Sequence, residues 1–433
     1  MQHETSSSST EEVGSRSTPN QHIIIIGGGL GGLCLAQGLK KAGISFYVYE
    51  RDPTSDFRPQ GYRIRLNHFG ALGLKACLSE ELWKIFEETC AKTVVGMTRI
   101  DAVECKVTSE VSGPEVLRTY MTKDVDPSTL LGPYTVDRRI IRTLLLNGLK
   151  GSVQFGKTFT HYSIEQNDDQ KKVVVAHFDD GTVARGDLIV GADGLKSRVR
   201  RQFLPDHVPV DLDMRGIYGK TVITPELLDR FPSSAMKWIT FIQDSRPLTL
   251  FVEPVRFNAD PAQVSPEFKV PSTPDYVYWA LGSRSSIYGL DDSELLGLTG
   301  ENAAQLTLKL TEGWSPDVRS LLQLQTVDEC AVVRISSVLP IIPAWEPSRN
   351  VTLLGDAVHV MSPTGGAGAN TALFDAAKLC AVLKEGDITE AAIGEYENAM
   401  RGFARKAIEY SWEGGKRICP QLPFEEGKPL ELN

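Results

Sequence analysis

Three glycines near the start of the chain have the spacing of a dinucleotide-binding turn. Gly27, Gly29 and Gly32 follow the isoleucine run 23–26 as G-x-G-x-x-G. This spacing allows a tight turn, the approach of a pyrophosphate to the backbone, and close packing of a helix on a strand. The N-terminus of such a helix offers unpaired N–H groups to phosphate oxygens. Glu50 ends the next expected strand, where a carboxylate can accept both hydroxyls of an adenosine ribose.

The surrounding residues predict the elements that position these groups. The four isoleucines form a β-branched run, which favours a strand covered on both faces. Apolar residues spaced over 33–39 give one helical face, and Gly43 is placed to end that helix. A second strand is predicted over 46–49. The pattern therefore predicts a strand, a glycine loop, a helix and a second parallel strand.

A second glycine-rich turn lies near the other end of the chain. The expected strand 350–354 ends in Gly355-Asp356, and the small residues of 361–370 then lead into another apolar helix. Small side chains let a ligand approach the backbone, and the helix N-terminus would hold negative charge. A turn without a ligand is the alternative.

Three arginines occupy positions where an anion would explain them. Arg63 and Arg65 alternate along the expected strand 61–67, so both point to one face, which is either a solvated edge or an anion-binding or flavin-facing surface. Arg138 stands at the start of a predicted helix, where the macrodipole opposes a cation unless an anion is near. Plain surface exposure is the alternative.

The middle of the chain changes character. Strands are predicted over 236–242, 248–252 and 276–281, without the crossover helices of a parallel sheet, and they indicate an antiparallel sheet. Its aromatic residues suit either an ordinary core or the wall of an apolar pocket. These residues are Trp238, Phe241, Phe251, Tyr278 and Trp279. Before this sheet, a hairpin is predicted over 172–184, and the strand 187–190 leads into a turn at Asp193.

Composition limits the class of protein. The 433 residues carry a net charge of −9 without a basic block, which argues against a nucleic-acid partner. Residues 1–20 are polar and are predicted to be disordered. No apolar run approaches the roughly 20 residues that span a bilayer, and no signal peptide is evident, so we expect a cytoplasmic protein. Seven scattered cysteines fit a reducing compartment, and no metal site is expected.

Three segments together resemble one family. Gly27-x-Gly29-x-x-Gly32 with Glu50, Gly191-Ala192-Asp193-Gly194 with Ser197 and Arg200, and Gly355-Asp356 with Pro363 are similar to the fingerprints of single-component FAD-dependent aromatic hydroxylases. These are class A flavoprotein monooxygenases of the para-hydroxybenzoate-hydroxylase-like fold, and the chain resembles their fungal secondary-metabolism members.

The resemblance implies an α/β fold with an inserted domain. A Rossmann-like FAD-binding domain would comprise 21–100, 130–210 and 340–433. A mainly antiparallel β-sheet substrate domain would comprise 101–129 and 211–339.

The resemblance also implies a set of cofactor-binding residues. Glu50 would bind the adenosine ribose, Arg138 the region of the pyrophosphate, and Asp356 the ribityl chain, while Asp193 is similar to a residue linked to both FAD and NAD(P)H. The whole implied set is Gly27, Gly29, Gly31, Gly32, Glu50, Arg51, Arg63, Arg138, Asp193, Asp356, Gly366, Ala367, Gly368, Ala369 and Asn370.

The implied reaction is a monooxygenation. NADPH or NADH would reduce the FAD, with the helix near Gly368 favouring the anionic reduced flavin. O2 would then give a flavin C4a-hydroperoxide that hydroxylates a small aromatic or polyketide-like substrate. Pro363 would shape the space for oxygen. Epoxidation of an alkene and Baeyer–Villiger insertion would use the same adduct, and a flavin-dependent reductase or dehydrogenase without oxygen insertion is the rival class.

Substrate activation is where the chain departs from the family pattern. Many relatives carry an arginine where this chain has Lys220, and a tyrosine before proline where it has Glu253. Lys220 would hold a phenolate or polarise a carbonyl, with Tyr218 and Glu253 as acid–base residues. A surface charge at a strand end is the alternative for Lys220, and Arg65 is an equal choice as the partner of a substrate anion. A monomer or homodimer is expected.

Overall fold

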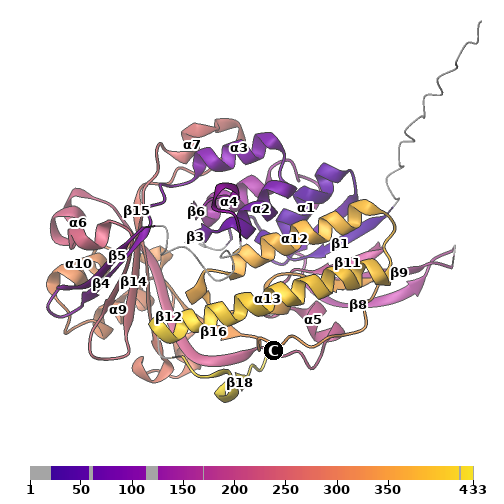
Figure 1. Ribbon diagram of the computed structural model, residues 1–433. Coiled ribbons are helices and arrows are strands. Elements are labelled where there is room, and N and C mark those ends of the chain that lie inside the picture. The colour runs from indigo at the N-terminus through magenta and orange to yellow at the C-terminus, as the bar shows by residue number, and fades with distance from the viewer. Residues whose placement is uncertain (1–20, 58–61, 114–124, 169, 419–420, 433) are drawn as a thin grey trace, which may run out of the picture.

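The computed structural model describes residues 21–57, 62–113, 125–168, 170–418 and 421–432. The predicted tail 1–20 and Cys419 lie outside these residues. Figure 1 shows two sheet-based parts, with the parallel sheet and its helices on the right and the larger sheet on the left.

A five-stranded parallel sheet, in the order β17-β11-β1-β2-β7, carries the first glycine loop. The four isoleucines of its central strand are at most 3% exposed, which confirms a strand covered on both faces. The strands are β1 (His22–Ile26), β2 (Ser45–Glu50), β7 (Val153–Phe155), β11 (Leu188–Gly191) and β17 (Val351–Leu353).

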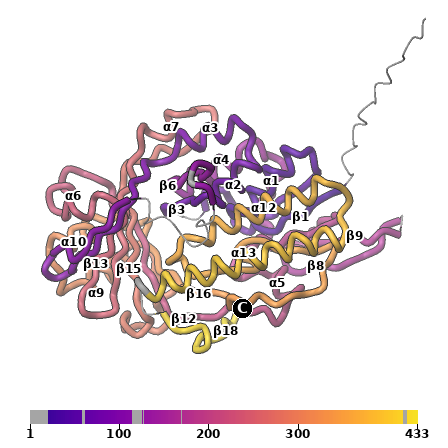
Figure 2. Tube along the Cα trace, viewed as in Figure 1, coloured from indigo at the N-terminus to yellow at the C-terminus, as the bar shows by residue number. Residues whose placement is uncertain are grey.

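Helices pack around this sheet. Helix α1 begins directly after the glycine loop and ends at Gly43, whose positive φ of 71° provides the left-handed cap that the sequence predicted. Helices α1, α2 and α12 pack on one another, and the long α13 lies beside α12 (Figure 2). The helices are α1 (Leu30–Ala42), α2 (His68–Cys77), α3 (Glu80–Thr89), α4 (Arg138–Leu146), α5 (Arg198–Phe203), α11 (Asp356–His359), α12 (Gly368–Glu385) and α13 (Glu390–Ile418).

An eight-stranded sheet forms the second part. Its strands follow the order β16-β12-β15-β14-β13-β4-β5, with β18 beside β12, and all pairs are antiparallel except β13 with β4. The strands are β4 (Gly96–Asp101), β5 (Val107–Ser112), β12 (Val210–Val222), β13 (Ile239–Gln243), β14 (Thr249–Val255), β15 (Tyr276–Arg284), β16 (Ala331–Ser337) and β18 (Lys428–Pro429). The helices α6 (Pro225–Arg230), α8 (Asp292–Leu295), α9 (Gly300–Leu310) and α10 (Pro316–Gln323) accompany this sheet, whereas α7 (Pro261–Val264) packs beside α3.

The mainly antiparallel character matches the expectation for the substrate domain, but two strands lie outside the ranges predicted for it. β4 begins at Gly96 and β18 lies at Lys428–Pro429, so each joins this sheet from a stretch assigned to the FAD-binding domain. The domain division itself stays a prediction.

Two small sheets complete the fold. β3 (Arg63–Leu66) pairs with β6 (Tyr134–Asp137), and this ribbon lies between the two larger parts (Figure 1). β8 (Phe159–Gln166), β9 (Lys172–Phe178) and β10 (Val183–Gly186) form an antiparallel sheet that includes the predicted hairpin.

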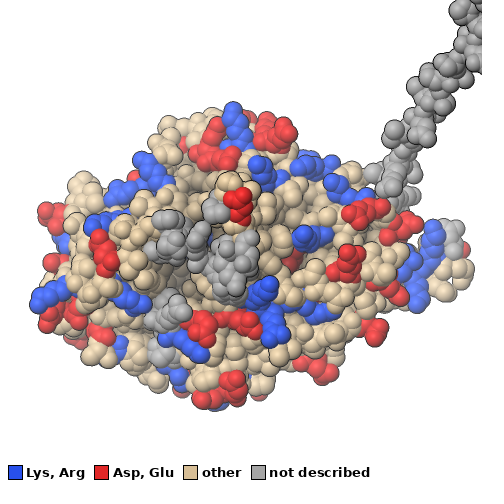
Figure 3. All heavy atoms as spheres, viewed as in Figure 1, with Lys and Arg blue, Asp and Glu red and all other residues tan. Residues whose placement is uncertain are grey.

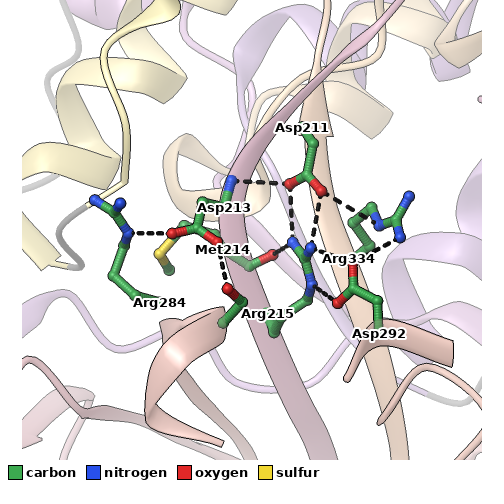
Figure 4. Close-up of polar contacts among 8 residues, drawn as sticks. Asp211, Asp213, Met214, Arg215, Arg284, Asp292 and Arg334 are labelled. Atoms are coloured by element: carbon green, nitrogen blue, oxygen red, sulfur yellow. Dashed lines mark hydrogen bonds and ion pairs between the residues drawn. The ribbon is translucent and has the colours of Figure 1, made fainter. Parts of the chain in front are cut away.

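An ion-pair network holds a bend in β12. The register of β12 against β16 shifts between Asp211 and Met214, and Asp213 has a φ of 57°. The buried Arg215 donates two hydrogen bonds to Asp211 and two to Asp292 (Figure 4). Arg334 pairs with the same two aspartates, and Arg284 pairs with Asp213. Three arginines and three aspartates therefore fix the irregular start of the sheet's longest strand.

Charges of both signs are mixed on the surface of the protein. Lysines and arginines alternate with acidic residues over the face shown in Figure 3. Within the described ranges, no helix has the length and apolar character needed to cross a membrane, and no histidine, cysteine and carboxylate group has the geometry of a metal site. The described cysteines are free thiols, and all but Cys105 are buried.

Candidate active site

A cleft of about 810 Å³ opens at the carboxyl ends of the parallel strands. The glycine loop after β1, the end of β2 and the turn after β11 all line it. Arg138, at the start of α4, completes the lining on the side of the small β3–β6 sheet. Ligands of open α/β sheets bind at this edge, so the location fits a dinucleotide.

The three motif glycines serve different purposes. Gly27 has a φ of +111°, and a Cβ there would lie 2.3 Å from the carbonyl oxygen of Ala192. A Cβ on Gly32 would lie 2.2 Å from the carbonyl oxygen of Gly27. A Cβ on Gly29 would meet no described atom within 4 Å. Packing therefore requires the first and third glycines, whereas the second leaves space beside the cleft, where a phosphate could approach.

Gly31 is explained by packing. A Cβ there would lie 2.7 Å from Cδ1 of Leu354 and 3.3 Å from Cβ of Ala372, so the absent side chain lets α1 approach β17 and α12.

Glu50 holds the glycine loop from the cleft wall. The backbone N–H of Gly28 donates to its Oε2 at 2.6 Å, and the N–H of Asp52 donates to its Oε1 at 2.9 Å. Each carboxylate oxygen keeps a lone pair, so Glu50 can still accept hydrogen bonds from ribose hydroxyls. The exposed Arg51 lines the same cleft.

Asp193 also lines the cleft and accepts hydrogen bonds at the start of helix α5. Its carboxylate accepts from the hydroxyl of Ser197 at 2.5 Å and from the N–H of Arg198 at 2.8 Å. Burial raises the pKa of Asp193, although these hydrogen bonds act in the opposite direction.

The sequence did not reveal that Arg200 joins the second motif to the third. This side chain is 1% exposed and donates to the carbonyl oxygens of Leu195 at 2.9 Å and Ala357 at 3.0 Å. Only the motif resemblance indicated Arg200. Its partners are backbone carbonyl groups, which every residue has, so the sequence does not reveal them.

Asp356 is the first residue of the short helix α11 and lies near the start of α12. Its carboxylate is solvent-accessible, yet desolvation by the surrounding protein raises its pKa, while His359 and Arg138 lower it. The Cβ position of Gly368, the first residue of α12, lies 3.7 Å from Oδ1 of Asp356. Arg138 thus lines the nucleotide cleft and is close enough to Asp356 to lower its pKa, whereas Asp356 itself is not among the residues that line the cleft.

Some residues at the start of α12 and in the loop before it are exposed, whereas others are buried or already hydrogen-bonded within the protein. Pro363 and Gly366 are exposed, Ala367 is buried, and Ala367 gives α12 no side-chain cap. The buried amide of Asn370 is fully engaged: it donates to the carbonyls of Arg65 and Gly366 and accepts from the N–H of Asn67. Asn370 therefore fixes β3 against α12, and only its backbone is free for a cofactor.

Arg63 and Arg65 point to one face of β3, as the sequence predicted, and that face is not a solvated edge. Both side chains are 11% exposed, and both pair with the carboxylate of Glu253 on β14, which is 3% exposed. Burial lowers the pKa of Arg63 to about 9 and that of Arg65 to about 10. Both guanidiniums remain charged at neutral pH.

Lys220 lies in a buried cluster, so the surface-charge alternative is wrong. Its ammonium is 2.9 Å from Oδ2 of Asp137 and 3.5 Å from Oε2 of Glu329. The hydroxyl of Tyr276 donates to the same Asp137 oxygen at 2.9 Å, and Asp137 caps the helix that begins with Arg138. The ammonium thus has two carboxylate partners in this state, and its part in substrate activation stays a prediction.

A row of aromatic rings faces β3 from the large sheet. Phe241 and Phe251 lie 5.5 Å apart, and Phe251 and Tyr278 lie 5.9 Å apart, between ring centroids. Tyr218 lies on the same face of the sheet, and burial raises its pKa. Trp279 lies on the other face, in the core, where its N–H donates to Thr221. The aromatic residues of the middle segment therefore lie on both faces of the sheet. Phe241, Phe251 and Tyr278 face β3, as a pocket wall would, and Trp279 belongs to the core.

Comparison with known proteins identifies the family. The FAD binding domain family matches residues 20–210 and 345–411, which include the three motifs. The chain belongs to this FAD-binding family. The match omits 211–344, which carries most of the large sheet.

The relatives of this family member are monooxygenases. It is 39% identical over 424 residues to the dual O-methyltransferase/FAD-dependent monooxygenase CTB3 of Cercospora beticola, covering 94% of this chain and 47% of that protein. The chain thus spans about half the length of that relative. It is 26% identical to the FAD-dependent monooxygenase thnD of Trichoderma harzianum, covering 93% of this chain and 95% of that one.

A solved structure shares the fold. A candidate FAD-containing monooxygenase from Photorhabdus luminescens has a TM-score of 0.75 and 28% identity, covering 92% of this chain and 99% of that chain. The predicted family, fold class and FAD cofactor are confirmed.

Proposed function

We propose that this chain is an FAD-dependent monooxygenase that uses NAD(P)H and O2 to hydroxylate a small aromatic or polyketide-like molecule. The observation that carries the proposal is the position of Arg138, which lines the nucleotide cleft, lies near Asp356, and lies over the ring of Tyr62 at 5.4 Å. Tyr62 in turn contacts Tyr218 on the large sheet, with ring centroids 5.8 Å apart. A path of contacts therefore leads from the cleft to the aromatic face.

The residues of the chain would hold and orient the cofactor. Glu50 would accept the ribose hydroxyls, the space beside Gly29 would admit the pyrophosphate, and Asp356 would accept from the ribityl chain. The N-terminus of α12 would favour negative charge on the isoalloxazine ring, because Ala367 leaves its first N–H groups without a side-chain cap. Bound FAD, reduced by NAD(P)H, supplies the activation of O2.

The row of rings would hold the substrate. Phe241, Phe251 and Tyr278 provide an apolar, planar surface, which suits a fused aromatic molecule. The relative CTB3 is named as both an O-methyltransferase and a monooxygenase. This supports a substrate with phenolic hydroxyls, since these are groups that an O-methyltransferase modifies. Phenols also activate their ortho and para carbons toward an electrophilic oxygen. We also propose that the protein acts in fungal secondary metabolism, that it is located in the cytoplasm, and that it is a monomer or homodimer.

Labelled oxygen tests the proposal. The purified protein should be yellow, and a phenolic or polyketide substrate should stimulate NAD(P)H oxidation and take up one atom from ¹⁸O2. Substrate-stimulated NAD(P)H oxidation without label in the product would instead indicate a flavin-dependent reductase or dehydrogenase. Label found only with alkene substrates would indicate an epoxidase. A colourless protein that cannot be reconstituted with FAD would refute the assignment.

A further inference from the structure

The ion pair between β3 and β14 has unequal charges. Arg63 pairs with Oε2 of Glu253, and Arg65 pairs with Oε1 of the same carboxylate. Two positive charges therefore meet one negative charge in a place where each side chain is at most 11% exposed. Buried charges are normally matched, so an unmatched guanidinium needs an explanation.

The same guanidiniums have hydrogen-bond donors to spare. Within the described part of the chain, Nε of Arg63 and both Nε and Nη1 of Arg65 are buried without an acceptor. Buried donors of this kind are costly and are normally paired. The position therefore has both the charge and the donors to bind an additional anion.

The neighbouring charged side chains do not balance the excess. Lys220 pairs with Asp137 and Glu329, and Arg139 also pairs with Glu329. Two cations thus meet two carboxylates in that cluster. The extra positive charge belongs to Arg63 and Arg65.

The pair lies beside the aromatic row. The guanidinium carbon of Arg63 lies 5.5 Å from the centroid of Phe251, and Tyr278 is close enough to raise the pKa of Arg63, against the larger lowering by burial. Glu253 and Tyr278 are directly opposed on β14 and β15. An aromatic molecule on these rings would place a substituent within reach of the guanidiniums.

We propose that Arg63 and Arg65 form a recognition site for an acidic group of the substrate, a carboxylate or an ionised phenol, for which Glu253 is the resident competitor. This inference rests on the proposed function for the identity of the bound molecule as the substrate. The incoming anion accepts charge-assisted hydrogen bonds from the unpaired donors. When no anion is bound, Glu253 is the carboxylate partner of both guanidiniums.

Binding of a model anion tests the site without turnover. FAD-saturated protein is titrated at pH 7 with 3-hydroxy-2-naphthoate and with its uncharged methyl ester, and binding is followed by the fluorescence of the naphthalene ring. We expect the acid to bind at least about tenfold more tightly than the ester, which is the change that a charge-assisted hydrogen bond typically makes. A failed oxygen-incorporation assay would leave this ratio measurable, so the two proposals can fail separately.

Two variants with opposite expected effects separate recognition from structure. Arg65→Met should weaken binding of the acid about tenfold and leave the ester unchanged. Glu253→Gln removes the competing charge and should tighten binding of the acid. Arg334→Met is the matched control, because it removes a half-buried arginine of the same sheet that pairs with Asp211 and Asp292; the ratio of acid to ester should stay as in the wild type.

Equal binding of acid and ester by the wild type would overturn the proposal. So would weaker binding of both compounds in Glu253→Gln, because an ion pair that only holds β3 against β14 predicts that result. If Arg65→Met does not fold, the wild-type ratio and the Glu253→Gln result still decide.

Discussion

Replacing Gly29 with alanine should separate cofactor binding from folding. Gly29 has a φ of −75° and a ψ of −177°, which an alanine adopts without strain, and its added Cβ would meet no described atom within 4 Å. Alanine is worse than glycine at a helix N-cap by up to about 1 kcal/mol. The smaller freedom of the unfolded chain offsets about 0.4–1 kcal/mol of this cost. The free energy of unfolding of the apoprotein should therefore change by less than about 1 kcal/mol.

The same methyl group should obstruct the cofactor. It would project into the space proposed for the pyrophosphate, and each phosphate hydrogen bond lost there costs about 1.5–3 kcal/mol. We therefore expect the Kd for FAD to rise about 10- to 150-fold. Quenching of FAD fluorescence measures the Kd, and urea denaturation of the apoprotein measures its stability.

Gly32→Ala is the matched comparison. Its Cβ would lie 2.2 Å from the carbonyl oxygen of Gly27, so the backbone must shift, at a cost of about 1–3 kcal/mol or more. This variant should lose stability even without FAD. Unchanged FAD affinity in Gly29→Ala would refute the reasoning, as would a loss of apoprotein stability as large as that of Gly32→Ala.

Three further changes test other parts of the site. Lys220→Met leaves the buried carboxylate of Asp137 without its cation, so the free energy of unfolding should fall by about 3–5 kcal/mol in urea denaturation; adding Asp137→Asn should recover part of it, and unchanged stability of the single variant would contradict the ion-pair account. Asp356→Ala should lower the FAD content of purified protein, and an unchanged flavin-to-protein ratio would exclude the ribityl role. Burial raises the pKa of Glu397 from 4.5 to about 7, so the folded protein holds this proton while the unfolded chain has lost it, and stability should fall by up to about 3 kcal/mol as pH rises from 4.5 through 7. In Glu397→Gln that part of the pH dependence should disappear, and an identical pH profile would count against a shifted Glu397.

The local parts of the site could be predicted because their causes are local. The isoleucine run, the glycine spacing and Gly43 specify a strand, a turn and a helix from neighbouring residues alone. The alternation of Arg63 and Arg65 likewise placed both on one face.

The partners of these groups could not be predicted. Glu253 is far from Arg65 in the sequence, and Asp137 is far from Lys220, so no spacing connects them. The sequence left Lys220 between a surface charge and a catalytic group because burial depends on how β12 packs against the β3–β6 ribbon and α4. Asn370 was assigned to the cofactor by its motif, whereas its amide is used to join β3 to α12.

The order of the strands has a consequence for the kinetics of folding. The glycine loop follows β1, but β11 pairs with β17 through Ile189 and Val351, and Gly31 packs on Leu354 and Ala372. Contacts between such distant residues form slowly, because the loop that separates them must close first. During synthesis, the ribosome must therefore release the chain as far as Ala372 before α1 and the parallel sheet have all of these packing partners. Until then the helix that follows the glycine loop lacks the surface on which Gly31 packs.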